Sequence, residues 1–228
     1  MLARLEQLYL RVDTEIGDDR ASIPVPSLRR SKRLFDVVFA LLLILLFAPL
    51  AALVALLVSL DGGPILFGHV RVGANGRPFR CWKFRSMCVD ADERLREMLA
   101  SDPLAREEWA RDHKLRKDPR VTRLGRVLRL SSLDELPQLL NVLTGSMSLV
   151  GPRPIVEAEI PRYGSAFVAY CKCRPGVTGL WQVMGRNNVS YARRVQLDNA
   201  YARHSSLKMD LLILLRTVVI VIRTEGVY

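Results

Sequence analysis

One uninterrupted apolar segment constrains this chain more than any other feature of its sequence. The 24 residues from Val37 to Leu60 carry no charge. As a helix they would extend about 36 Å, which exceeds the hydrocarbon core of a bilayer at about 30 Å. The segment starts well inside the chain and ends without a small-residue cleavage pattern, unlike a signal peptide. We therefore expect a membrane segment that stays in the mature protein.

The residues in the middle and at the ends of this segment indicate whether it spans the membrane or re-enters on the same side. Pro49 removes a backbone hydrogen bond near the centre and predicts a bend. Basic residues precede and follow the segment, namely Arg29, Arg30, Lys32 and Arg33 before it and Arg71, Arg77, Arg80, Lys83 and Arg85 after it. Basic flanks favour the cytoplasmic side, so both ends favour the same face. On the residues alone, a re-entrant helix and a spanning helix with a central proline stay equally open. Asp36, at the apolar boundary, is expected to pair with Lys32 or Arg33.

The net charge of the chain indicates what kind of partner it binds, and the spacing of its cysteines indicates the redox environment in which it works. The 228 residues include 34 Lys and Arg against 23 Asp and Glu, for a net charge of +11. This excess indicates anionic partners, and the apolar segment favours phospholipid headgroups and phosphorylated metabolites over nucleic acid. The four cysteines have no disulfide-like spacing, which indicates a reducing setting. Cys171 and Cys173 would need two further ligands to bind zinc, so we favour small buried side chains there.

The stretch RLSSLDELPQLLNVLTGSMSLVGPRP places the acid pair Asp134 and Glu135 between Arg129 and Arg153. A carboxylate can attack phosphorus or hold a divalent cation, while guanidinium groups neutralise phosphate oxygens. Ser132 and Glu135 fit a capping box, which predicts that Asp134 lies near a helix N-terminus. The acids could also serve only as helix caps. The leucines of the following helix have core spacing: Leu136, Leu139, Leu140 and Leu143.

Other segments add candidate elements and contacts. Ile65–Met87 predicts a hairpin around Asn75-Gly76, and its Lys83 and Arg85 either reach phosphate or face solvent and membrane. Residues 89–117 predict a helical hairpin broken at Asp102-Pro103, and we favour a solvated hairpin over an interfacial one.

Two further segments lie toward the C-terminus. We expect residues 174–188, which are glycine-rich and have no helical or strand period, to form a loop. Arg174 and Arg186 could approach a ligand there, and Trp181 could stack on a base or lie at the interface, or the loop could be only structural. Residues 206–222 predict an apolar helix too short in its uncharged stretches to span a membrane. Its Asp210 either caps the helix or serves a site.

Several long motifs occur here in a fixed order: KRLFDVV, GHVRVGANGRPFRCWKFRSM, DPRVTRLGRVLRLSSLDELPQLLNVLTGSMSLVGPRP and RPGVTGLWQVMGRN. From about Lys32 to the C-terminus, this order resembles the bacterial sugar transferase family. These are monotopic phosphoglycosyl transferases that prime polysaccharide assembly on polyprenyl phosphate. The details are similar to rhizobial-type exopolysaccharide production proteins that resemble galactosyl-phosphate transferases.

The resemblance implies an activity. We expect a Mg²⁺-dependent transfer of hexose-1-phosphate from a UDP-sugar to undecaprenyl phosphate, releasing UMP through a covalent aspartyl phosphosugar. Galactose is favoured as the sugar, with glucose as the alternative. The implied location is the cytoplasmic face of the bacterial inner membrane, in contact with its lipid. A homodimer stays open, and a non-catalytic basic scaffold of an export complex is the other alternative.

The resemblance also assigns roles to residues. Asp134 is similar to the family nucleophile and Mg²⁺ ligand, and Glu135 to its partner acid. The predicted substrate-binding residues are Lys83, Arg85, Arg129, Arg153, Arg174, Arg186 and Asp210. The expected fold is mostly helical with a small β-hairpin and interfacial helices. It comprises a variable arm over 1–31, a re-entrant membrane helix over 32–62, and a cytoplasmic, membrane-interface transferase domain over 63–228.

Overall fold

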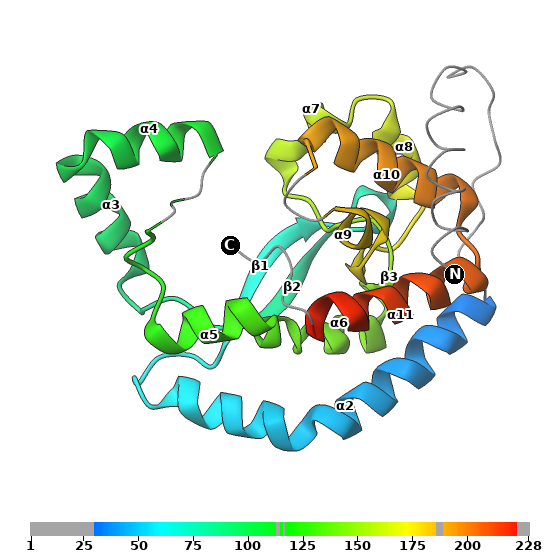
Figure 1. The fold of residues 1–228 in the computed structure, drawn as a ribbon, viewed down its shortest axis with the longest axis horizontal. Helices are drawn as coiled ribbons and strands as arrows, with labels where there is room; N and C mark the ends of the chain where they lie inside the picture. The colour runs from blue at the N-terminus through cyan, green and yellow to red at the C-terminus, as the bar shows by residue number, and fades with distance from the viewer. Residues whose placement is uncertain (1–29, 113–114, 116, 186–188, 223–228) are drawn as a thin grey trace. The chain divides into compact units, whose positions relative to one another are not determined.

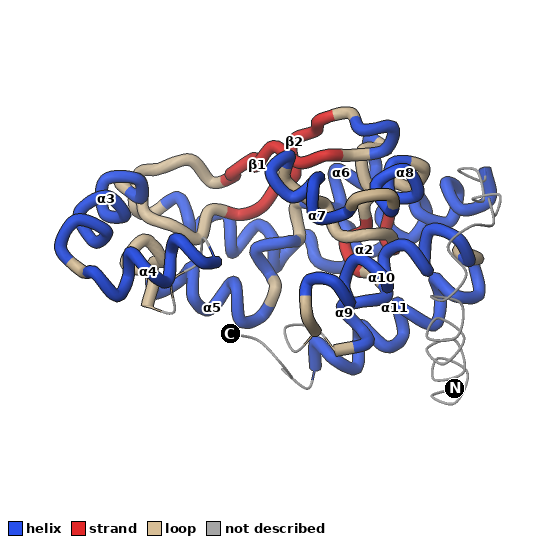
Figure 2. The backbone as a smooth tube through the Cα atoms, turned by 90° about the horizontal axis from the view of Figure 1, so that it is seen from above, coloured by secondary structure: helices blue, strands red, loops and turns tan. Residues whose placement is uncertain are grey.

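Helices dominate the described part of the chain, and the strands there form two short pairs (Figures 1 and 2). The computed structural model describes residues 30–112, 115, 117–185 and 189–222, so the expected arm over 1–31 lies almost wholly outside the described residues. The chain divides into two compact units. Unit 1 holds the described parts of Met1–Leu46, Gly68–Cys81 and Gln138–Gly226, and unit 2 holds those of Phe47–Phe67 and Trp82–Pro137.

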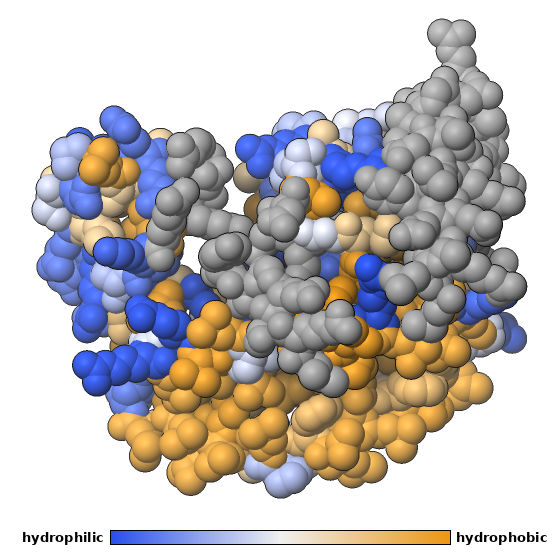
Figure 3. All heavy atoms as spheres, viewed as in Figure 1, coloured by the Kyte–Doolittle hydropathy of each residue, from blue (hydrophilic) through white to orange (hydrophobic). Residues whose placement is uncertain are grey.

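Helix α2 (Arg30–Ser59) contains the whole apolar segment except its last residue, with Pro49 in its interior. Its most apolar window of 18 residues has a mean hydropathy of 3.1 and is only 11% buried. Leu45 and Leu46 are 71% and 68% exposed, and Figure 3 shows a nearly continuous hydrophobic surface over this helix. By length and composition, α2 could cross a membrane. The predicted long apolar helix is therefore confirmed.

The predicted hairpin is confirmed as β1 (Leu66–Val72) and β2 (Pro78–Phe84), joined through the short turn η1 (Ala74–Gly76). Asn75 and Gly76 both have positive φ angles, of 57° and 70°. Asparagine and glycine tolerate this left-handed conformation better than other residues, which is why the Asn-Gly pair locates the turn.

Unit 2 also contains α3 (Ala91–Ser101), α4 (Pro103–Asp112) and α5 (Arg123–Ser131). The predicted break before Pro103 is confirmed. Asp102 Oδ1 accepts hydrogen bonds from the N–H groups of Leu104 and Ala105, so a new helix starts there. The core of unit 2 packs α2, β2 and α5 together through Val54, Val58, Phe84 and Leu128.

Unit 1 is built around a short parallel sheet in which β3 (Ser148–Val150) pairs with β4 (Gly176–Thr178). Its helical elements are α6 (Gln138–Thr144), η3 (Glu157–Glu159), α7 (Ile160–Tyr163), α8 (Ala166–Cys171), α9 (Leu180–Met184), α10 (Tyr191–His204) and α11 (Leu207–Ile222). Helix α10 packs on α8 and α9, and α11 packs on α9 and the β3–β4 sheet. The predicted C-terminal helix is thus confirmed as α11.

Two expectations for unit 1 are wrong. The glycine-rich stretch after Arg174 contains β4 and α9, elements too short to show a period in the sequence. Leu140, expected in the core, is 46% exposed. The polar residues Gln138 and Asn141 occupy the buried face of α6 instead, where Asn141 Nδ2 donates to the Arg80 carbonyl.

Candidate functional site

The acid pair lies in η2 (Leu133–Glu135), a single turn of 3₁₀ helix between α5 and α6. The predicted capping box is wrong. Ser132 has φ 58° and ψ 16°, its side chain caps nothing, and its N–H donates to the Arg129 carbonyl at the end of α5. An N-cap residue needs an extended backbone, whereas a left-handed residue ends a helix. For a serine this conformation is uncommon, and such strain is often found at functional sites.

Lys83, at the end of β2, faces both acids. Its Nζ lies 2.5 Å from Glu135 Oε1 and 3.7 Å from Asp134 Oδ2. Asp134 is only 6% exposed, and this burial raises the pKa of its carboxyl group, whereas the charge of Lys83 opposes the rise. The structure therefore brings the predicted site residues Lys83, Asp134 and Glu135 into contact.

Arg129 adds a second cation on the same side of unit 2. Its Nε donates to Ser86 Oγ at 2.9 Å. Partial burial lowers the pKa of Arg129, and the charge of Asp134 counteracts this effect. No hydrogen bond involves its two terminal nitrogens within the described residues of the chain. These four N–H donors are therefore available to an anionic ligand near the acid pair.

Arg85, another predicted substrate contact, is 8% exposed and uses all of its donors within unit 2. Its guanidinium forms a bidentate pair with the Asp61 carboxylate. The remaining N–H groups donate to the carbonyls of Val58, Pro64 and Met87. In this arrangement Arg85 offers no free donor to a substrate. It instead fastens the end of α2 to the strand that carries Lys83.

The predicted substrate-binding residues of unit 1 differ from one another in their surroundings. Arg153 lies over the Trp181 ring, with its Cζ 5.5 Å from the ring centroid. Arg174 is half-buried, and its pKa is lowered by burial and by the charge of Arg33. Arg186 lies outside the described residues. Asp210 is fully buried inside a polar network, where both of its carboxylate oxygens are used.

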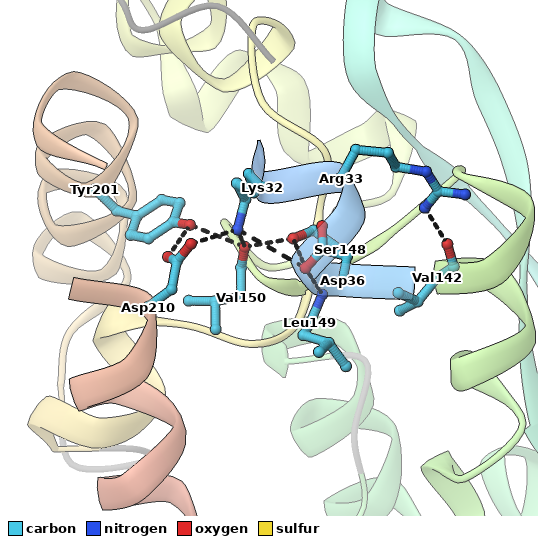
Figure 4. Close-up of polar contacts among 9 residues, drawn as sticks. All are labelled: Lys32, Arg33, Asp36, Val142, Ser148, Leu149, Val150, Tyr201 and Asp210. Atoms are coloured by element: carbon cyan, nitrogen blue, oxygen red, sulfur yellow. Dashed lines mark hydrogen bonds and ion pairs between the residues drawn. The ribbon is translucent and has the colours of Figure 1, made fainter. Parts of the chain in front are cut away.

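This network attaches the start of α2 to the rest of unit 1 (Figure 4). Lys32 Nζ donates to Asp210 Oδ2 at 2.7 Å, and Tyr201 Oη donates to Asp210 Oδ1 at 2.7 Å. Asp36 Oδ1 accepts a hydrogen bond from Ser148 Oγ and lies 4.0 Å from Lys32 Nζ. Lys32, one of the two partners expected for Asp36, is therefore confirmed. Asp210 therefore has a clear structural role.

The acid pair has donor chemistry that fits Mg²⁺. No cluster of three His, Cys, Asp or Glu side chains among the described residues could surround a metal ion. Mg²⁺, however, commonly keeps several waters and is bound through one or two carboxylates plus substrate phosphates. The partly uncompensated, buried Asp134 with Glu135 beside it fits such a partial ligand set.

Sequence reasoning missed Arg194 and Asp198, both on α10. Arg194 Cζ lies 4.2 Å from the Trp181 ring centroid, and Asp198 is 1% exposed with Tyr163 Oη donating to it at 2.8 Å. Neither residue belongs to a motif with recognisable spacing. Trp181 itself is only 3% exposed, so it is not the open stacking platform that the sequence suggested.

Known proteins are similar to this chain over most of its length. The UDP-galactose-lipid carrier transferase of Erwinia amylovora is 52% identical over 223 residues, 98% of this chain and 45% of that protein. The undecaprenyl-phosphate galactose phosphotransferase of Salmonella typhimurium is 50% identical over 202 residues, 89% of this chain and 42% of that protein. The exopolysaccharide production protein ExoY of Rhizobium meliloti is 52% identical over 199 residues, 87% of this chain and 88% of that protein.

The chain thus spans less than half of the first two relatives and most of the third. The family model described as bacterial sugar transferase matches residues 27–224, which include both units and the acid pair. The chain therefore belongs to the bacterial sugar transferase family.

Proposed function

We propose that this protein is a phosphoglycosyl transferase that moves hexose-1-phosphate from a UDP-sugar to undecaprenyl phosphate and releases UMP. The observation that carries the proposal is the buried Asp134 beside Glu135, with Lys83 and Arg129 facing them in unit 2. Two acids with two cations suit chemistry on a phosphate, and the family and the names of the relatives supply the substrate class.

In the first step, an Asp134 carboxylate oxygen attacks the β-phosphorus of the donor. The bond between this phosphorus and the bridging oxygen breaks, and UMP leaves with the bond's electron pair. Lys83 and Arg129 stabilise the charge that develops on the phosphate oxygens. Mg²⁺, held by Asp134 and Glu135, would screen the repulsion between carboxylate and diphosphate.

In the second step, a phosphate oxygen of undecaprenyl phosphate attacks the aspartyl phosphorus. The bond to Asp134 breaks, which regenerates the carboxylate and leaves an undecaprenyl diphosphate sugar. Dividing the transfer into two displacements lets a soluble donor and a lipid acceptor use the same carboxylate in turn. The scheme therefore predicts ping-pong kinetics.

The membrane is the place where the lipid acceptor is met. The exposed apolar surface of α2 supports membrane association. We further propose that α2 enters and leaves the cytoplasmic leaflet of the bacterial inner membrane, because both of its flanks are basic and Pro49 lies in its interior.

Galactose is the proposed sugar, since two relatives are named for galactose transfer. UDP-glucose is the alternative donor for the same chemistry. The priming step of exopolysaccharide synthesis is the proposed role, in line with the name of the Rhizobium relative.

The deciding experiment uses purified protein with UDP-galactose and Mg²⁺ but no lipid acceptor. Mass spectrometry should find one hexose-phosphate adduct on Asp134, with an equal amount of UMP released. Asp134→Asn should lose the adduct and at least about 10³-fold in turnover, equivalent to about 4 kcal/mol of barrier. The control Glu107→Gln, an exposed acid on α4, should behave like the wild type. Release of UDP, or sequential kinetics without an adduct, would contradict the mechanism.

A further inference from the structure

Several arginines among the described residues have their donors taken up by the fold. Arg85 and Arg120 each form a bidentate pair with an aspartate, and Arg33 donates to two carbonyls at the end of α6. These side chains are satisfied by the fold. Arg153 and Arg194 in unit 1 differ, because no hydrogen bond or ion pair joins either guanidinium to another described residue.

Both unpaired arginines lie against one indole. Arg194 Cζ is 4.2 Å and Arg153 Cζ is 5.5 Å from the centroid of the Trp181 ring. Trp181 Nε1 and Arg194 Nε are buried without a hydrogen-bond partner among the described residues. A cation–π contact stabilises a guanidinium by about 0.5–2 kcal/mol, but it provides no acceptor for the N–H groups.

Nearby acids compensate for these two cations only in part. Burial lowers the pKa of Arg194, and the charge of Arg153 lowers it further, whereas the charges of Asp198 and Glu159 raise it. The charge of Arg153 also lowers the pKa of Arg71, whose Nη1 forms an ion pair with Glu159 Oε2 at 3.9 Å. The buried Asp198 accepts its side-chain hydrogen bond from Tyr163, and neither guanidinium donates to it. Unit 1 therefore holds two guanidiniums whose N–H donors have no acceptor among the described residues, and the oxygens of an anionic ligand would satisfy them.

We propose that Arg194, together with Arg153, binds a phosphate group of the substrates, with Trp181 as the surface that orients both guanidiniums. The inference rests on the proposed function and adds Arg194 to the substrate-binding residues. Phosphate suits the site because its oxygens accept the paired N–H donors of a guanidinium, which a lysine cannot reproduce. The same chemistry is offered by the nucleotide diphosphate and by the lipid phosphate, so the experiment treats them separately.

The test measures binding without turnover, in the full chain carrying Asp134→Asn. One arm titrates UDP by calorimetry, and the other titrates farnesyl phosphate, a soluble analogue of the lipid acceptor. Arg194→Met, which keeps an apolar stem against Trp181, should weaken binding at least about tenfold in one or both arms. The matched control is Arg162→Met, because Arg162 also lies over an aromatic ring, 4.8 Å from the Tyr191 centroid, but is exposed. The control should stay within about twofold.

The arm that loses affinity identifies the phosphate that Arg194 binds. Unchanged dissociation constants in both arms would overturn the proposal. If Arg194→Met fails to fold by circular dichroism, Arg194→Lys decides instead. It keeps the charge but lacks the fork of donors, so it should still weaken binding about threefold or more, and wild-type affinity would refute the site. A missing adduct at Asp134 would count against the proposed reaction alone, since these binding constants do not depend on turnover.

Discussion

Asp198 should make the stability of this protein depend on pH, and a single isosteric substitution tests this. The residue is 1% exposed on α10, Tyr163 Oη donates to its Oδ2 at 2.8 Å, and its Oδ1 has no partner among the described residues. Burial raises the pKa of Asp198 to about 7 from an ordinary value of 3.8, although the hydrogen bond from Tyr163 opposes the rise. Asp198→Asn keeps the shape and the acceptor for Tyr163 but removes the ionisation.

The sign follows from the direction of the shift. A carboxyl group with a higher pKa in the folded state binds its proton more tightly there, so protonation favours folding. Its contribution is most favourable below pH 3.8, decreases as the pH rises toward about 7, and is constant above that. The whole window corresponds to roughly 4 kcal/mol, of which roughly 2.5 kcal/mol falls between pH 5 and pH 8.

The assay is urea unfolding of detergent-solubilised wild type and Asp198→Asn at several pH values between 5 and 8. The difference in unfolding free energy between the two proteins should move in favour of the variant by roughly 2.5 kcal/mol across this range. Taking the difference cancels the titration of all other groups. Glu107→Gln, which removes an exposed acid, is the control and should give a nearly constant difference. A constant difference for Asp198→Asn would refute the assignment of a raised pKa to this carboxyl group.

Three further predictions concern the anchor, the topology and the donor. Arg85→Met should destabilise the protein by about 2–3 kcal/mol in the same unfolding assay, because it leaves the buried carbonyl of Val58 and the partly buried carbonyl of Pro64 without their donor. Arg94→Met, which removes an exposed pair with Asp90, should cost at most about 0.5 kcal/mol, and equal losses would contradict the structural role of Arg85. Single cysteines placed at positions 20 and 70 of a cysteine-free variant should both resist a membrane-impermeant thiol reagent added to spheroplasts, because both flanks of α2 are proposed to be cytoplasmic. Labelling at position 20 alone would establish a spanning helix. Pro49→Leu should raise the labelling at position 20. UDP-galactose should be used faster than UDP-glucose in the UMP assay, and faster turnover of UDP-N-acetylhexosamines would refute a hexose donor.

Local signals in the sequence were sufficient for most of the secondary structure. The Asn75-Gly76 turn and the break at Asp102-Pro103 depend on the backbone preferences of the residues themselves, and both were predicted correctly. The apolar segment of α2 follows from composition alone. Ser132 was mispredicted because its pattern fits a helix start, whereas the packing of α5 requires a left-handed helix end at that position.

In the candidate site, too, one part could be predicted from the sequence and another part could not. The motif around Asp134 and Glu135 was visible in the sequence because neighbouring acids between arginines are a contiguous chemical pattern, and the family match supports its relevance. The role of each arginine was not visible, since arginines in similar motifs have the same chemistry until the fold gives them partners. Asp61 and three carbonyls occupy Arg85, which the sequence had offered as a substrate contact.

The sequence by itself determined the apolar helix, the hairpin, the acid pair and the family, because these depend on composition, local backbone preference and contiguous motifs. Only the tertiary structure decided which charges are satisfied. Lys32 and Asp210 are 178 residues apart in the chain, yet they form a partly buried ion pair. Arg194 and Arg153 lie far apart in the sequence, yet both guanidiniums lie over the Trp181 ring. The physical reason is that burial and distance set the energy of a charge, and both arise only when distant segments pack together.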